Sequence, residues 1–300
     1  MKKSRMLRSP ALALPLLLLT ATPCLPQSTA TARSPLPLWK LPGQSNTVWL
    51  LGSIHFCKED FYPLPRPIED AYRGSDSLVL EIDLAEETSL ETQMLILREG
   101  MNSPGETLSQ QISQATYENL KKWAQEEVGG VALFEPQKPW LAAITIMVVE
   151  IQKLGFNPEH GIDRHFYRRA RTDQKRVVGL EKAAFQLGLL SSLSKSEQED
   201  MLKSTLQEIG KLPAIFRDIV DSWKTGDAKK LEPLLNDSMK EYPGIWKRLV
   251  LDRNQDWLTK IEKLRAEPKN VFVVVGMGHL IGEGSVVDLL RKKGLKVEQQ

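Results

Sequence analysis

Short apolar runs rich in β-branched residues, separated by long helical stretches, constrain the fold of this chain more than any other feature. The run Val271–Val275 contains only valine and phenylalanine, which is typical of a fully buried strand. Two stretches of helical character, 88–172 and 183–266, separate the third, fourth and fifth runs. Strands joined through helices pair in parallel. The expected strands are 36–41, 47–54, 77–82, 176–180 and 271–275.

The two ends of the expected sheet add further elements. Residues 42–46 are turn formers between the first two strands, which predicts a β-hairpin. After the fifth strand, a helix over Ser285–Lys293 and a strand over 295–298 predict a parallel, right-handed crossover. We therefore expect an α/β fold with a central, mostly parallel β-sheet, an N-terminal hairpin, flanking helices and large helical insertions.

Residues 1–32 match the three-part pattern of a secretory signal peptide. Four basic residues precede the apolar run 11–19, and Ala30-Thr31-Ala32 favours cleavage near Ala32. The apolar run is too short to span a membrane. We expect an exported protein, periplasmic or secreted, with one domain over 33–300 and no transmembrane segment in the mature chain. Lipid attachment at Cys24 is the alternative, although Ala21-Thr22-Pro23 is a poor motif for it.

Charge and cysteine content narrow the classes of partner. Removal of the four basic residues in 1–32 changes the formal net charge from +2 to −2. The chain lacks a basic stripe, so nucleic acid is not an expected partner. A peptide or a small molecule is the expected substrate. The only cysteines are Cys24 and Cys57, so neither a disulfide framework nor a thiolate zinc site is expected. Any metal must therefore be held by nitrogen and oxygen.

Four of the expected strands deliver a polar residue at or near the carboxyl end: His55, Glu81, Glu181 and His279. Both histidines stand in a Gly-x-x-His motif, Gly52–His55 and Gly276–His279. Parallel strands bring their carboxyl ends to one edge of a sheet, so these side chains are expected to meet there.

Two imidazoles with a carboxylate suit a divalent metal ion, and His55, His279 and Glu81 are the expected ligands. Manganese, cobalt and zinc are the candidate ions. A bound ion lowers the pKa of its water toward about 7, and a free glutamate could act as general base. Each residue also has a structural interpretation. A histidine at a strand end can be a structural residue held by hydrogen bonds. The negative charge of Glu181 can interact favourably with the dipole at the start of the next helix.

Arg253 is expected to point inward. It lies on the helical stripe of Trp246, Val250 and Trp257, and a buried guanidinium needs carboxylate partners such as Glu81 or Glu181. The alternative is an arginine whose head reaches water. Asn254 lies a hundred degrees round the helix and is expected only at the rim of the site. Asp163, beside Ile162 and Phe166, is a candidate to reach inward.

A dinucleotide-binding unit is a rival interpretation of the last motif. Gly276-x-Gly278 follows a strand, precedes a helix and has Glu298 about 20 residues further on. The third glycine of that fingerprint is replaced by Ile281. The hydrolytic interpretation is therefore preferred.

Taken together, the motifs resemble the TraB/GumN family, which includes the TIKI metalloproteases. The resemblance implies an α/β fold of the erythromycin-esterase/ChaN-like kind and, in TIKI members, divalent-metal-dependent peptide cleavage. It assigns the histidine roles to His55 and His279, the acidic role to Glu81, and support to Glu181 and Arg253. The motifs are Leu38-Trp39-Lys40, Val48–His55, Leu78–Asp83, Gly161-Ile162-Asp163, Gly179-Leu180-Glu181, Arg253-Asn254 and Val275–Gly282.

Two functions are consistent with this sequence. The first is an exported metal-dependent hydrolase, a peptidase, that uses the two Gly-x-x-His motifs and a glutamate. The second is a non-catalytic protein that binds and sequesters a peptide or small ligand in the same cleft. Turnover of a peptide separates them.

Overall fold

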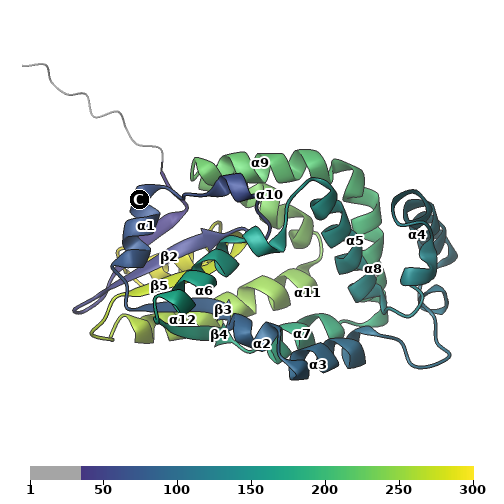
Figure 1. The fold of residues 1–300 in the computed structure, drawn as a ribbon, viewed down its shortest axis with the longest axis horizontal. Coiled ribbons are helices and arrows are strands. Elements are labelled where there is room, and N and C mark those ends of the chain that lie inside the picture. Colours follow the sequence, from purple (N-terminus) through teal and green to yellow (C-terminus); the bar gives the residue numbers. More distant parts are fainter. Residues whose placement is uncertain (1–34) are drawn as a thin grey trace, which may run out of the picture. The chain divides into compact units, whose positions relative to one another are not determined.

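The computed structural model describes residues 35–300, except for the side chain of Ser238. The predicted signal peptide, residues 1–32, lies outside the described residues and stays a prediction. A six-stranded sheet with the order β4-β3-β5-β2-β1-β6 forms the centre of the described part (Figure 1). The strands are β1 (Leu38–Pro42), β2 (Thr47–Ser53), β3 (Ser77–Ile82), β4 (Arg176–Glu181), β5 (Val271–Gly276) and β6 (Glu298–Gln299).

The four central strands of this sheet run in one direction. β5 pairs in parallel with both β2 and β3, and β3 pairs in parallel with β4. Their carboxyl ends therefore share one edge of the sheet. The predicted α/β fold with a mostly parallel sheet is confirmed.

Antiparallel pairing is confined to the N-terminal hairpin and its outer neighbour. β1 and β2 form the predicted hairpin, with Leu41 opposite Val48. β6 pairs antiparallel with β1. Because β1 runs against β5, β6 has the same direction as β5, as the predicted crossover requires. β6 is only two residues long and starts later than the predicted strand 295–298, since it pairs with β1 only at Trp39 and Lys40.

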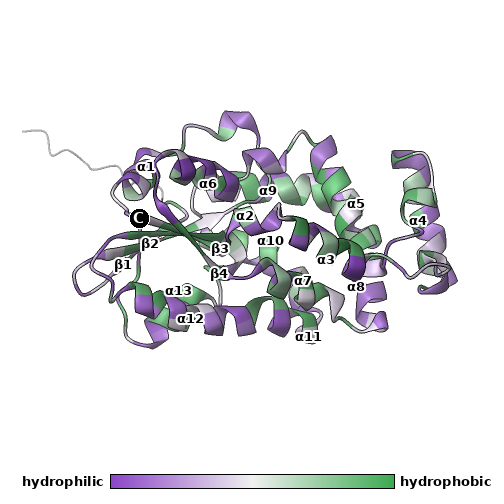
Figure 2. Cartoon of the chain, turned by 60° about the horizontal axis from the view of Figure 1, so that its bottom comes forward, coloured by the Kyte–Doolittle hydropathy of each residue, from purple (hydrophilic) through white to green (hydrophobic). Residues whose placement is uncertain are grey.

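Helices cover both faces of the sheet. α1 (Arg66–Arg73) and α6 (Ile162–Thr172) pack on one face, and α12 (Asp252–Leu264) and α13 (Val286–Lys292) lie on the other (Figure 2). Figure 2 also shows that the strands are hydrophobic while the outward helix faces are hydrophilic. No helix within residues 35–300 combines the length and apolar character needed to cross a membrane.

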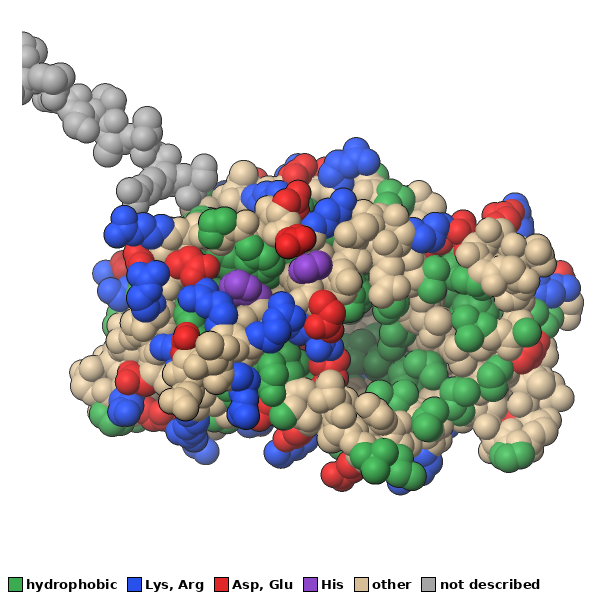
Figure 3. Space-filling model, viewed as in Figure 1, with side chains coloured by type: hydrophobic (Ala, Val, Ile, Leu, Met, Phe, Trp, Pro, Cys, Tyr) green, Lys and Arg blue, Asp and Glu red, His purple; other side chains and the backbone are tan. Residues whose placement is uncertain are grey.

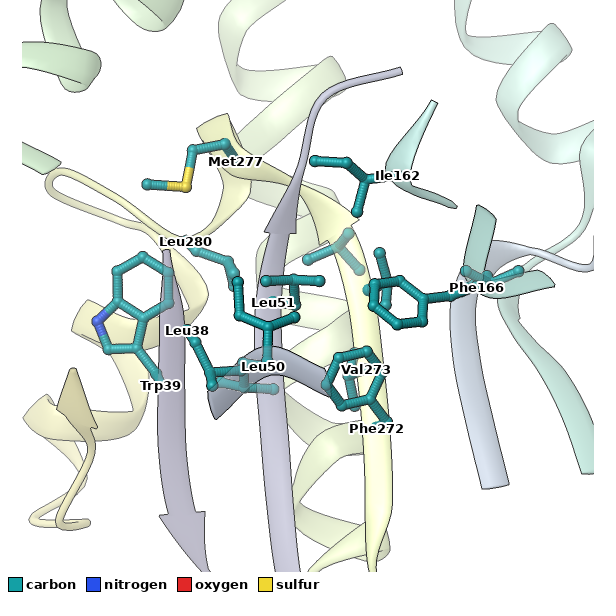
Figure 4. Close-up of a cluster of buried hydrophobic side chains, with 14 of the residues drawn as sticks. Leu38, Trp39, Leu50, Leu51, Ile162, Phe166, Phe272, Val273, Met277 and Leu280 are labelled. Carbon is teal, nitrogen blue, oxygen red and sulfur yellow. The ribbon is translucent and has the colours of Figure 1, made fainter. Parts of the chain in front are cut away.

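The main core joins the sheet to the helices that cover it, and one layer of it lies between the sheet and α6. Phe166 of α6 packs edge-on against Phe272 of β5, with ring centroids 4.9 Å apart, and Ile162 lies beside Leu51 (Figure 4). All four of these side chains are fully buried. Burial of a large apolar side chain stabilises a fold by roughly 1.5–3 kcal/mol, so this layer fixes the position of α6 over the carboxyl ends of the strands.

The helical insertions have a second, separate core. Leu120 and Trp123 of α4 (Gln114–Glu127) pack with Ile146 of α5 (Pro139–Lys153) and Leu202 of α8 (Lys195–Glu208). The remaining helices are α2 (Leu84–Glu87), α3 (Leu90–Gly100), α7 (Ala183–Ser191), α9 (Leu212–Lys224), α10 (Ala228–Lys240) and α11 (Pro243–Trp246).

Trp223 links α9 to the end of β2. Its indole N–H donates a 2.7 Å hydrogen bond to the carbonyl of Gly52, and its side chain is buried. Trp223→Phe removes this donor inside the core, so we expect the free energy of unfolding to fall by about 1–3 kcal/mol beyond the loss of ring volume. Urea unfolding measures the change.

Trp39→Phe is the matched control for that experiment. Trp39 is buried to the same extent, and its indole nitrogen makes no hydrogen bond within residues 35–300. Equal destabilisation by the two substitutions would contradict a role for the Gly52 carbonyl.

Candidate active site

The structure brings all the predicted site residues together at the carboxyl edge of the sheet. His55 follows β2, Glu81 lies in β3, Glu181 is the last residue of β4, and His279 ends the short 3-10 turn η7 (Met277–His279) after β5. Arg253 enters from α12 and is 9% exposed. The predicted convergence of the strand ends is therefore observed, while the chemical roles stay predictions.

Arg253 lies at the centre of this group. Its Nε donates to the Glu181 carboxylate at 3.0 and 3.1 Å, and its Nη2 donates to Glu81 at 2.7 Å and to Glu181 at 3.0 Å. Its Nη1 donates to the Leu249 carbonyl and to His279 Nε2, both at 3.0 Å. Every nitrogen of the guanidinium is therefore bonded, as a buried cation requires.

Glu81 is held as a carboxylate. Its Oε1 accepts a 2.7 Å hydrogen bond from the Gly276 backbone N–H, and its Oε2 accepts from Arg253 and from Gln186 of α7. Burial would raise the pKa of Glu81, but the nearby charge of Arg253, the two histidines and the Gly276 N–H together hold this pKa well below its usual range. Glu81 is therefore ionised throughout the physiological range.

His279 is a buried, neutral histidine. Its Nδ1 donates to Asn254 Oδ1 at 2.7 Å, which leaves Nε2 to accept from Arg253. Burial lowers the pKa of His279 to about 4, and its ring packs against Trp257 at a centroid distance of 4.5 Å. Both ring nitrogens are thus occupied by protein partners.

His55 has the opposite character. Its Nδ1 lies 2.9 Å from Oδ2 of Asp163, at the start of α6. The His55 side chain is 55% exposed, and the charge of Asp163 raises its pKa to about 9. Its Nε2 makes no hydrogen bond with a described residue and lies near Gly276, where an added Cβ would be 3.6 Å away. A carboxylate on one nitrogen and a free second nitrogen is the arrangement of a proton-transfer histidine.

A cavity of about 250 Å³ opens beside His55. Its floor is formed by strand residues, and its walls come from α2, α6 and α7. Arg164 is its cationic residue and is paired at 2.6 Å with Glu87. The lining residues are Ser53, His55, Phe56, Leu80, Glu81, Ile82, Leu84, Glu87, Pro158, Asp163, Arg164, Gln186 and Val274.

The predicted metal ligands do not present three free donor atoms to one ion. His279 faces the space above Gly276 with its Cδ2 atom, because Arg253 and Asn254 bind its nitrogens. Within residues 35–300, no three side chains of the histidine, cysteine, aspartate or glutamate types are grouped so as to hold a metal ion. The His55–Glu81–His279 set therefore does not fit an ion in this arrangement, since Arg253 lies among the predicted ligands.

Gln186 was not predicted from the sequence, while Asp163 was expected only to reach inward and had no partner assigned. Asp163 and Gln186 come from helices and bind strand-end residues that are distant in the chain. Asn254 was expected at the rim but is fully buried and binds both His279 and the Gly284 carbonyl. The reason is the width of the buried face of α12, which includes 253, 254, 257, 258 and 261 because the helix contacts α13 as well as the sheet.

His160 and His165 lie outside the site. His165 stacks on Tyr62 with ring centroids 4.1 Å apart, and it lines no part of the cavity. Its pKa is lowered to about 4, mainly by burial.

Comparison with known proteins gives the family. Residues 37–299 match the sequence model of the TraB/PrgY/gumN family. The chain belongs to this family. The matched range includes both Gly-x-x-His motifs and every residue of the cluster around Arg253, so the site belongs to the family domain. No solved structure matches the chain.

The relatives of this family member are bacterial proteins. The "Uncharacterized protein YbaP" of Shigella flexneri is 29% identical over 253 residues, which cover 84% of this chain and 90% of that protein. The protein of the same name in Escherichia coli K12 has the same identity and coverage. An "Uncharacterized protein" of Treponema pallidum is 24% identical over 306 residues, covering 93% of this chain and 90% of its own length.

Arg253→Met leaves two carboxylates in the protein interior without their cation. Removing one partner of a buried ion pair costs about 3–5 kcal/mol, and we expect a loss of that size in the free energy of unfolding. In the Arg253→Met background, Glu181→Gln removes one uncompensated charge and is expected to restore part of the stability. Urea unfolding of both single variants and the double variant completes the cycle.

Glu181→Gln alone is the reference for this cycle, because it is expected to destabilise the protein when Arg253 is present. A double variant no more stable than Arg253→Met would contradict the ion-pair account of the cluster.

Proposed function

We propose that this family member is a hydrolase in which His55 takes a proton from water, and that peptides are its substrates. The observation that carries the proposal is the pairing of His55 Nδ1 with Asp163, at 2.9 Å, while Nε2 borders the cavity. The resemblance to TIKI metalloproteases supports peptides as the substrate class.

The proposed reaction uses the chain's own groups. Water attacks the carbonyl carbon of a bound peptide as its proton passes to His55 Nε2, and the same nitrogen then protonates the leaving amine. Asp163 holds the ring in the correct tautomer and stabilises the imidazolium. Arg164 is the cationic group of the cavity wall and can face the oxygen that becomes negatively charged.

One side of the site is held in place by hydrogen bonds among Glu81, Glu181, Arg253 and His279. Their mutual hydrogen bonds leave the neutral His279 unable to accept a further proton easily, because burial keeps its pKa near about 4. The negative charge of Glu81 also raises the pKa of His55. The cluster therefore acts on the reaction through His55.

The divalent ion expected from the sequence stays a prediction, and no step above is assigned to one. Bound in a site of this kind, such an ion would supply a more acidic water. The donor atoms of His279 are already bonded, so the structure favours water activation by His55.

His55→Ala is expected to lower peptide cleavage by about 100- to 10,000-fold, the range for loss of a general base. The measurement is cleavage of a mixed peptide library followed by mass spectrometry. His165→Ala is the control, because His165 is a partly buried histidine outside the cavity. Peptides retained intact by the wild-type protein would instead indicate the sequestering function.

The same assay after dialysis against EDTA tests whether cleavage requires a divalent metal ion. We expect cleavage to persist at close to its original rate. Complete loss, with recovery on addition of manganese, cobalt or zinc, would overturn the assignment of His55 as the base.

Cleavage is expected to rise with pH up to about 9, because only the neutral form of His55 accepts a proton and its pKa is raised to about 9. The charged groups facing His55 are Asp163, Glu81, Arg253 and Glu87. Asp163→Asn removes the carboxylate that raises this pKa most, so the cleavage rate should reach its plateau at a lower pH. The rate at the plateau should also fall. A pH–rate profile of both proteins measures this, and an unchanged midpoint in the variant would contradict the proposal.

A further inference from the structure

Helix α7 is apolar on every side, yet it is barely buried. Apart from Gln186, its residues from Ala183 to Leu190 are alanine, phenylalanine, leucine and glycine. A helix that is hydrophobic all round is normally enclosed in a core. In α7 only Ala183 is buried, and Phe185 is 51% exposed.

Helix α3 is also little buried, and it packs against α7. Only Gly100 of α3 is buried, while Leu90, Met94 and Leu97 are 72%, 62% and 60% exposed. Spacings of four and three place these three side chains on one helix face. Together with Phe185 they form the α3–α7 surface, which holds four of the seven large apolar side chains exposed within residues 35–300.

The α3–α7 surface adjoins the cavity of the site. Gln186, next to Phe185, lines the cavity and binds Glu81, while Leu84 and Glu87 of α2 line its wall just before α3 begins. Glu86 of α2 accepts a 3.3 Å hydrogen bond from the first N–H of α7. Figure 3 shows hydrophobic side chains around the central hollow and along the lower edge, where Figure 1 places α3.

Charge indicates what kind of apolar ligand this surface suits. From Glu81 to Glu106 the chain has seven acidic residues and one basic residue, Arg98. Four of these acids are paired with cations from elsewhere or nearby in the chain, whereas the exposed Glu91 and Glu106 form no ion pair with a described residue. The pairs are Glu81 with Arg253, Glu86 with Lys182, Glu87 with Arg164 and Glu99 with Arg98. An acidic rim repels an anionic lipid surface and attracts lysine and arginine.

We propose that the α3–α7 surface binds an extended, apolar peptide segment flanked by basic residues, and so selects the substrate of the neighbouring site. That the bound peptide is also a substrate rests on the proposed hydrolytic function, whereas its binding to this surface does not. Leu90 to Leu97 spans about 10 Å of helix, which matches about three residues of extended peptide. Large exposed apolar patches are characteristic of such binding surfaces.

Binding of a fluorescein-labelled peptide of sequence Lys-Lys-Leu-Val-Leu-Val-Leu-Lys-Lys tests this by anisotropy. The protein is the full chain carrying His55→Ala, so that the peptide stays intact. In this background, Met94→Ser with Leu97→Ser is expected to weaken binding at least about tenfold, because two apolar contacts are lost. Circular dichroism and the melting temperature should not change, since both side chains are exposed.

Val128→Ser with Leu133→Ser is the matched control, because these exposed apolar residues lie outside the α3–α7 surface and should change the affinity less than about twofold. Replacing the four lysines of the peptide with glutamate should abolish binding. Equal loss in both double variants, or equal binding of the glutamate peptide, would overturn the proposal.

Two further results would also overturn it. One is binding of phosphatidylglycerol vesicles, but not of the peptide, that depends on Met94 and Leu97. The other is dimerisation through these residues, seen by analytical ultracentrifugation, without peptide binding. Peptide binding with the expected variant pattern, but without cleavage by the wild-type protein, would support this surface while contradicting the proposed hydrolysis.

Discussion

The buried guanidinium of Arg253 is the interaction on which the site depends. A single cation binds Glu81 of β3, Glu181 of β4 and His279 after β5, so it ties three strand ends to α12. Two carboxylates this deep in a protein would be strongly destabilising without it. Because every nitrogen of the group is bonded, the cluster has little freedom to rearrange, and it gives His55 a constant electrostatic environment.

Two copies of one short motif acquire opposite properties in this environment. Both histidines follow a strand and a glycine, yet burial lowers the pKa of His279 to about 4 while Asp163 raises that of His55 to about 9. Groups whose pKa values are driven apart in this way commonly have different roles. Here one ring is a fixed hydrogen-bonding partner of Arg253, and the other can exchange a proton with the cavity.

The difference between these histidines also shows where sequence reasoning ends. Strand-end residues were predictable, because parallel strands bring His55, Glu81, Glu181 and His279 to one edge whatever lies between them. Arg253 was predictable from its helical stripe, but the side chains contributed by the other helices were not, because their contacts depend on helix position and rotation. Asp163 meets His55 from 108 residues away. Asn254, next to Arg253, is buried because the buried face of α12 also meets α13.

Chain connectivity explains why an apolar surface lies beside a charged site. The helices α2 and α3 directly follow β3, which carries Glu81, and α7 directly follows β4, which ends at Glu181. The segments that leave these strands must therefore pass the edge where the strand-end side chains of the site meet. Since the Arg253 cluster already fixes the strand ends, α3 and α7 can present apolar side chains outward without carrying the stability of the site. The proposed substrate selection and the proposed proton transfer thus lie in neighbouring but separately stabilised parts of one fold.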